Sequence, residues 1–204
     1  MSISSADEGI AALDRVAPWL AILLALSANS PFWQGRDSAY ASFRYQVWGR
    51  WPCSGPTAAF GSARAYQEIR VADVCLHADD AVLIAALARA LVETETRRWR
   101  RGEPLQRSRT ELLRLAAWRA SRSGMDEVLL NPFTGLPEQP AAVTNTLLAH
   151  VSDALADAAE TDTVTDLLAA VLARGNGAIF QRNIYRRSSN LPEIITSAAA
   201  ATRR

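Results

Sequence analysis

Residues 25–48 read Ala25-Leu-Ser-Ala-Asn-Ser-Pro-Phe-Trp-Gln-Gly-Arg-Asp-Ser-Ala-Tyr-Ala-Ser-Phe-Arg-Tyr-Gln-Val-Trp48, and this stretch decides how the chain is understood. An apolar helix ends in a polar loop with one proline, residues 29–36, which a buried core does not require. A helix is predicted over residues 39–48, where Arg44 follows Tyr40 by about one helical turn beside an aromatic face. Because arginine forms bidentate hydrogen bonds with carboxylates and phosphates, the stretch indicates a site that binds anions.

The elements around this stretch predict an α+β protein dominated by helices. Upstream, Asp7–Ser27 shows the apolar spacing of a helix, and Pro18 predicts a kink or a restart in it. Downstream, alternation predicts one strand, residues 66–75, in a reduced antiparallel sheet. The remaining helices are predicted over residues 79–101 (capped by Asp79 or Asp80), 112–122 (after a capping box at 108–111), 141–159, 163–174, 178–187 and 192–201, with a loop at 131–140.

The charge balance argues against a nucleic-acid partner. The chain has 22 basic and 21 acidic residues, for a formal net charge of +1, whereas nucleic-acid binding favours a basic excess on one face. Every basic residue is an arginine, which is the better bidentate partner for carboxylate and phosphate. We therefore expect no nucleic-acid partner.

Cysteine use and hydropathy indicate a cytoplasmic protein. Cys53 and Cys75 have no metal-ligand spacing, so we expect two reduced thiols. The acidic, polar residues 1–8 do not resemble a secretory signal, and the apolar run 16–28 is shorter than the roughly 20 residues that span a bilayer. We therefore expect no membrane partner.

Glu68 and Arg70 are two residues apart on the predicted strand, so their side chains should project from the same face about 7 Å apart. This spacing suits one metal ligand and one anion clamp in the same pocket, because Mg²⁺ takes oxygen ligands together with substrate phosphates. The alternative is an ion pair on a solvated sheet face, which is common and contributes little stability.

The segment Gly175-Asn-Gly-Ala-Ile-Phe-Gln-Arg182 begins a predicted helix with two glycines. The spacing and the lysine of a P-loop are missing. Helix capping with packing is the expected role, and anion binding by the helix N-terminus and Arg182 is the alternative. His77 and His150 have no partner at ligand spacing and are expected to be solvated or capping residues.

These motifs together resemble the carboxylate–amine ligase family, also called type 2 glutamate–cysteine ligases, which are relatives of glutamine synthetase. The resemblance continues through Gly49-Arg-Trp-Pro, Phe60-Gly-Ser and Glu68-Ile-Arg-Val-Ala-Asp-Val into the helical part, and covers nearly the whole chain. It implies the C-terminal part of a glutamine synthetase-like catalytic fold. Residues 1–204 would form one truncated domain, with the pocket in residues 7–76 and a helical part in residues 77–204.

The resemblance implies a ligase that uses ATP and Mg²⁺. Family members activate a carboxylate, such as the γ-carboxylate of glutamate, as an acyl phosphate, which an amine such as cysteine then attacks. By this resemblance Glu68 would be a metal ligand, and Arg70 and Arg44 would bind the reacting anions. The substrate and ATP pocket would be lined by Asn29, Ser30, Trp33, Arg36 and Arg182.

The chain departs from the family pattern in two places. It lacks the Gly-x-Glu-x-Glu strand that supplies acidic metal ligands, and the join between Phe60 and Glu68 is shortened. Two interpretations follow: a ligase that is active only if another chain supplies the missing N-terminal half, or a catalytically inactive remnant that serves as a binding or interaction module. The expected protein partner is a complementing N-terminal chain or a second copy in a homo-oligomer. An all-α regulatory protein unrelated to ligases would leave residues 29–48 unexplained.

Overall fold

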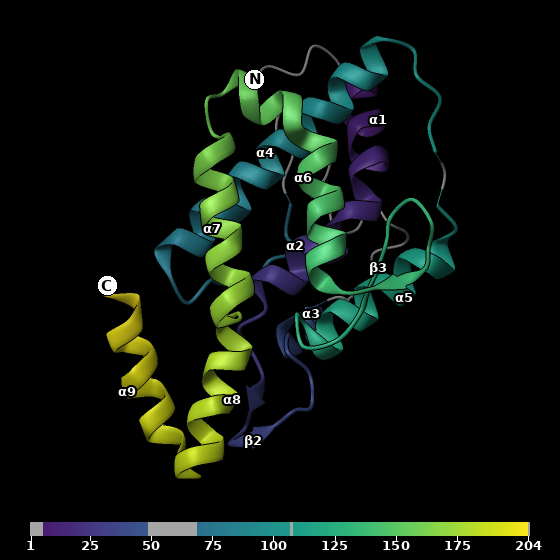
Figure 1. The fold of residues 1–204 in the computed structure, drawn as a ribbon. Coiled ribbons are helices and arrows are strands. Elements are labelled where there is room, and N and C mark those ends of the chain that lie inside the picture. Colours follow the sequence, from purple (N-terminus) through teal and green to yellow (C-terminus); the bar gives the residue numbers. More distant parts are fainter. Residues whose placement is uncertain (1–5, 49–68, 107, 204) are drawn as a thin grey trace.

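The computed structural model describes residues 6–48, 69–106 and 108–203. Helix α2, Leu20–Ser27, is a core helix, and nearly all of its residues are buried (Figure 1). It follows α1, Ala6–Val16, and the short 3₁₀ helix η1, Ala17–Trp19. Pro18 lies in η1, because a proline lacks the N–H that a continuous helix needs. The predicted restart at Pro18 is therefore confirmed.

Asp7–Ser27 taken as a whole is long and apolar enough to cross a membrane, the one such stretch among the described residues. In the structure 61% of the apolar 18-residue window within it is buried inside the protein. A helix that is apolar on most sides is also typical of a protein core, and this burial accounts for its composition.

Four long helices form most of the rest of the core. Helices α4, Ala78–Arg100, and α5, Thr110–Ser123, pack against α2, while α6, Pro140–Asp157, and α7, Thr161–Arg174, pack against α4. Each contributes apolar side chains at helical spacing, and burying one such side chain is worth about 1.5–3 kcal/mol. The core they share includes Leu23, Leu24, Leu83, Leu87, Leu91, Leu147, Val151 and Leu168.

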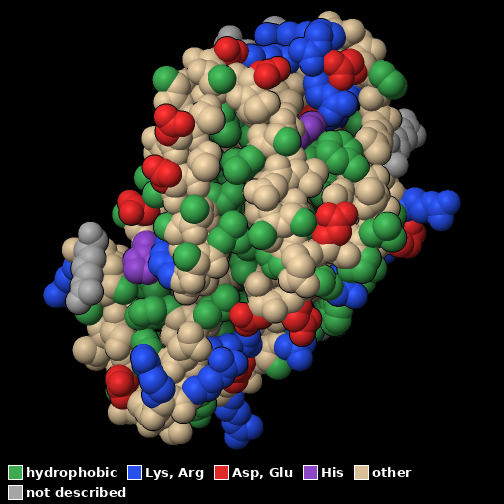
Figure 2. Space-filling view, in the orientation of Figure 1, with side chains coloured by type: hydrophobic (Ala, Val, Ile, Leu, Met, Phe, Trp, Pro, Cys, Tyr) green, Lys and Arg blue, Asp and Glu red, His purple; other side chains and the backbone are tan. Residues whose placement is uncertain are grey.

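The C-terminal helices form a hairpin at one end of the bundle, where α8, Gly177–Ser188, runs on from α7 and α9, Leu191–Thr202, returns beside it (Figure 1). The short helix α3, Phe43–Trp48, packs against α5. On the face shown in Figure 2, basic and acidic side chains are interspersed at both ends, with hydrophobic side chains between them. This distribution agrees with the nearly neutral net charge.

The strands of the described residues form two small antiparallel hairpins. Strand β1, Phe32–Trp33, pairs with β2, Arg36–Asp37, and strand β3, Leu129–Leu130, pairs with β4, Pro137–Glu138. Gln34 and Gly35 both have positive φ, as the two-residue turns of β-hairpins require. The predicted class, predominantly helical α+β, is confirmed, but the predicted loop over residues 131–140 contains β4.

The predicted strand over residues 66–75 is also wrong in its described part. Residues 69–75 are extended, with a single bridge residue at Ile69. The backbone N–H of Asp73 donates to Ser27 Oγ, and the carbonyl of Val74 accepts from Asn29 Nδ2. These two groups therefore pair with Ser27 at the end of α2 and with Asn29 in the loop that follows it.

Three helix starts differ from prediction. Helix α3 begins at residue 43 and not at residue 39, because the Asp37 carboxylate accepts the Ala39 N–H in a turn and Ser42 Oγ accepts the Tyr45 N–H. The predicted capping box before α5 does not form, since its N-cap residue makes no side-chain hydrogen bond. His77 takes the N-cap position of α4 that was expected for an aspartate.

Candidate functional site

One buried carboxylate, Asp73, holds the loop that follows α2, and it is 6% exposed. Its Oδ2 accepts hydrogen bonds from the Asn29 backbone N–H at 2.9 Å and the Ser30 hydroxyl at 2.7 Å. Its Oδ1 accepts from the Ser42 hydroxyl at 2.8 Å. A buried charge needs such partners, and here they fix both ends of the loop to the extended segment at residues 69–76.

Arg44 lies beside this carboxylate. Its backbone N–H donates to Ser30 Oγ at 3.0 Å, and its Nη1 donates to the Ala72 carbonyl at 3.0 Å and lies 3.8 Å from Asp73 Oδ1. Its side chain is 38% exposed, and among the described residues Nε and Nη2 make no hydrogen bond or ion pair. Arg44 is therefore positioned by structural partners and still has one edge of its guanidinium for an anion.

Asn29 connects the same loop to α8. Its Oδ1 accepts from Gln181 Nε2 at 2.7 Å, and its backbone carbonyl accepts from the same nitrogen at 2.9 Å. A Cβ atom on Gly177 would lie 1.9 Å from Asn29 Oδ1, so this approach requires a glycine. The structure thus brings Asn29, Ser30 and Arg44 together around Asp73.

The Gly-Asn-Gly segment anchors α8 to the end of α2. Asn176 is 1% exposed; its Oδ1 accepts the Ile179 N–H at 3.1 Å and its Nδ2 donates to the Ala25 carbonyl at 2.8 Å. The N–H of Ala178 donates to the Ala28 carbonyl at 2.9 Å. The predicted role in helix capping and packing is confirmed.

Arg182, a predicted substrate or ATP contact, pairs with the β1–β2 hairpin. Its Nε and Nη2 donate to the two carboxylate oxygens of Asp37 at 3.0 and 2.9 Å, and Nη2 also donates to the Tyr40 carbonyl. Burial alone would raise the pKa of Asp37, but the Arg182 hydrogen bonds and charge, the Ala39 N–H and the charge of Arg122 together lower it. Contact of Arg182 with a substrate stays a prediction.

An open hollow of about 460 Å³ lies beside the hairpin. Trp33 and Arg36 line it together with Phe43, and the Trp33 and Phe43 ring centroids are 5.4 Å apart. Trp33 is 54% exposed, which is unusual for so large an apolar ring. The hollow therefore combines an exposed aromatic wall with one exposed guanidinium, which can pair with a carboxylate or phosphate.

Of the predicted pair Glu68 and Arg70, only Arg70 lies among the described residues. Arg70 is exposed in the extended segment that leads to Asp73, and Glu68, the predicted metal ligand, lies outside the described residues. Among the described residues no group of three His, Cys, Asp or Glu side chains could hold a metal ion. Both oxygens of Asp73 accept hydrogen bonds from N–H or O–H donors, so it does not offer a metal site.

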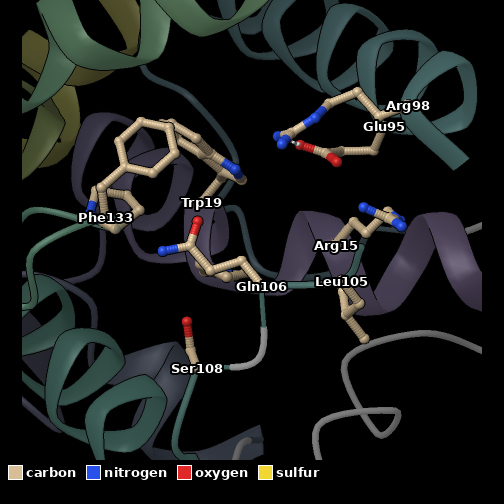
Figure 3. Close-up of a pocket in the computed structure, with 10 residues that line it drawn as sticks. Arg15, Trp19, Glu95, Arg98, Leu105, Gln106, Ser108 and Phe133 are labelled. Carbon is tan, nitrogen blue, oxygen red and sulfur yellow. Dashed lines mark hydrogen bonds and ion pairs between the residues drawn. The ribbon is translucent and has the colours of Figure 1, made fainter. Parts of the chain in front are cut away.

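A second pocket lies between α1, η1, α4 and the β3–β4 hairpin (Figure 3). Its cavity of about 30 Å³ has room for about one water molecule. At its wall Glu95, which is 2% exposed, lies 2.6 Å from His150 Nε2, and the His150 ring stacks on Trp19 at a centroid distance of 4.2 Å. The prediction that His150 is solvated or a helix cap is therefore wrong, because it is a partner in a buried polar pair.

Asp73 is the site residue that the sequence argument missed. The available signal was a carboxylate on the same face of the predicted strand as Ile69 and Val71, where an apolar residue is expected. An acid on an otherwise apolar face indicates a buried charge with specific partners.

Comparison with known proteins identifies similar chains. The model of the family described as glutamate-cysteine ligase family 2 matches residues 1–67 and 56–197. A protein of Streptomyces avermitilis, provisionally named glutamate–cysteine ligase 2-1, is 45% identical over 99% of this chain and 64% of its own length. A Streptomyces coelicolor protein with a similar provisional name, glutamate–cysteine ligase 2, gives the same figures, and one from Paenarthrobacter aurescens is 41% identical over 61% of its length.

The chain thus spans less than two thirds of the length of these relatives. The alignment with the Streptomyces avermitilis protein has 233 positions and this chain has 204 residues, so the relative also has internal residues that the chain lacks. The two family matches overlap at residues 56–67, where the sequence predicts a shortened join. The overlap supports an internal shortening at this point.

Proposed function

The chain belongs to glutamate–cysteine ligase family 2, and on this premise we propose that it is part of an ATP-dependent carboxylate–amine ligase. The family match, which extends over most of the chain, is the observation that carries the proposal. The arrangement around Asp73 supports it, because it presents Arg44 beside a loop built from polar residues.

In the proposed reaction an oxygen of the glutamate γ-carboxylate attacks the γ-phosphorus of ATP, which forms an acyl phosphate and releases ADP. The nitrogen of an amine such as cysteine then attacks the acyl carbon and loses a proton as phosphate leaves, so an amide bond forms. Such chemistry depends on positioning and on neutralising the charge of the transferred group. Glutamate, the amine and ATP are the proposed small-molecule partners, in the cytoplasm.

The proposed roles follow the geometry of each side chain. The Nε–Nη2 edge of Arg44 would bind a substrate carboxylate, and Arg70 would face the reacting group. Arg36, at the open hollow, would neutralise phosphate charge next to the Trp33 ring. Asn29 and Ser30 would form the wall of the pocket through the loop that Asp73 holds.

Magnesium would supply further neutralisation of phosphate charge when bound. The described residues do not make a site for it, as their carboxylates form no suitable group. We propose that Glu68 contributes one ligand and that the part of the family fold that this chain does not span contributes the others.

Thermal unfolding with and without MgATP and glutamate tests the proposal. A ligand at 100 times its Kd stabilises the native state by about 2.7 kcal/mol, which would raise Tm by about 5–10 °C for a chain of this size. The shift should be lost in Arg36→Ala and Arg70→Ala, which replace exposed residues, and kept in the control Arg114→Ala on the exposed side of α5.

The partial coverage of the relatives favours a second candidate, a catalytically inactive remnant that acts as an interaction module. Cooperative unfolding without any ligand shift would favour this remnant. Absence of cooperative unfolding would mean that the chain folds only with its missing part.

A further inference from the structure

Helix α5 carries a row of exposed apolar side chains. Leu112, Leu115 and Trp118 follow one another at intervals of three residues, which places them along one side of the helix. They are 39%, 41% and 47% exposed. Their alignment distinguishes them from apolar residues scattered singly over a surface, which are normal.

The β3–β4 hairpin extends this row. A Cβ atom on Gly135 would lie 3.5 Å from Leu112 Cδ1, so the hairpin turn contacts the start of the row. Leu136, the next residue, is 62% exposed. We call Leu112, Leu115, Trp118 and Leu136 the α5 patch.

Helix α5 packs into the protein core through a different side from this patch. Ala116 and Ala120 are buried, and α5 packs against α2 through this side. The α5 patch therefore adds apolar area that the described fold does not use. Exposed charged residues, Arg109, Glu111 and Arg114, lie next to the patch in sequence and give it a polar rim. Apolar patches with a polar rim and a tryptophan are typical of protein interfaces.

The length of the relatives indicates what could bind to the α5 patch. They are longer than this chain by more than a third of their own length, and they are aligned over nearly all of the residues that the chain has. If the relatives form one continuous fold, the residues that only they possess need an apolar surface on the matched part to pack against. We infer that the α5 patch binds the part of the family fold that this chain does not span.

This inference rests on the proposed function, because a complementing segment would also supply the missing metal ligands. The arrangement predicts the chemistry of the partner. It should present an apolar face to Leu115 and Trp118, with acidic side chains opposite Arg109 and Arg114.

Co-expression tests the inference. The tagged chain is produced together with the part of the Streptomyces avermitilis relative that the chain does not match, and both are purified through the tag without nucleotide. We expect recovery of both chains in equal amounts. Leu115→Glu and Trp118→Glu should reduce the recovered partner at least tenfold, whereas the control Ile195→Glu, at a 70% exposed position of α9, should leave it unchanged.

Circular dichroism of each purified variant is the control for folding. Recovery that is equal for all variants, or no recovery with the unaltered chain, would overturn the inference. A homodimer of the chain alone that Trp118→Glu dissociates would show that a second copy occupies the patch, which also overturns it. Because nucleotide is absent, the outcome is separate from ligand binding: recovery of the partner, with no MgATP thermal shift in the assembled complex, would count against the ligase proposal alone.

Discussion

The Ser30 hydroxyl donates a hydrogen bond of 2.7 Å to Asp73 Oδ2 across 43 residues of sequence, and the same hydroxyl accepts the Arg44 N–H. This single contact links the loop after α2, the start of α3 and the extended segment before α4. The position of Arg44, the proposed binder of the substrate carboxylate, therefore depends on a buried carboxylate whose hydrogen-bond donors come from the loop around it.

Asp73→Asn should destabilise the protein by about 2–4 kcal/mol, because the buried hydroxyl and N–H donors lose a charged acceptor. The measurement is urea unfolding at neutral pH. Asp153→Asn, at an exposed position of α6, is the control and should change the free energy of unfolding by less than about 0.5 kcal/mol. Equal effects of the two substitutions would refute the role of Asp73.

Gly177→Ala should displace α8 from the Asn29 loop, because the new Cβ would lie 1.9 Å from Asn29 Oδ1. Gly102→Ala is the comparison: no heavy atom lies within 4 Å of its new Cβ, and only its positive φ of 70° opposes the change. That backbone strain costs about 1–2 kcal/mol, and the loss at Gly177 should exceed it in urea unfolding. A smaller loss at Gly177 would contradict the close approach.

The Asp37–Arg182 pair should make stability depend on pH at the acid end. The pKa of Asp37 is lowered in the folded protein, so its contribution is fully present above the unfolded value, about 3.9, and is lost as pH falls through the lower folded value. As the pH falls from 5 to 3, the free energy of unfolding of the Asp37→Asn variant should therefore decrease less than that of the unaltered chain. Identical slopes for the two proteins would show that the pair contributes nothing.

The Cys75 thiol should react slowly with alkylating reagents at neutral pH. Burial, followed by the charges of Asp80 and Asp73, raises its pKa to about 11. In a Cys53→Ser background, alkylation by iodoacetamide should stay slow at pH 8 and accelerate only as the pH approaches 11. The same chain unfolded in urea serves as the control and should react readily at pH 8. Fast alkylation of the folded protein at pH 8 would show that Cys75 is accessible as a thiolate.

Local signals predicted much of the helical framework. Pro18 marked the restart between α1 and α2, and the Gly-Asn-Gly segment before Arg182 marked the start of α8. Both depend on residues within one turn of the feature, so a single sequence contains the information. The capping box before α5 failed because tertiary packing decides which of several available residues begins a helix.

Contacts across long stretches of sequence could not be predicted in this way. Asp73 meets Ser30 across 43 residues, and His150 meets Glu95 across 55. Periodicity shows that a polar residue lies on an apolar face, but it does not show which distant donor will satisfy it. For the same reason Arg44 was identified as an anion binder without the carboxylate that positions it.

Glutamate-dependent release of ADP tests the central claim most directly. The chain is co-purified with the unmatched part of its Streptomyces avermitilis relative and supplied with MgATP, glutamate and cysteine. We predict one ADP per amide product, with both lost in Arg70→Ala and both kept in the control Arg187→Ala, at an exposed position of α8. Release of ADP without amide product, or no release from the assembled complex, would contradict the assignment as a carboxylate–amine ligase.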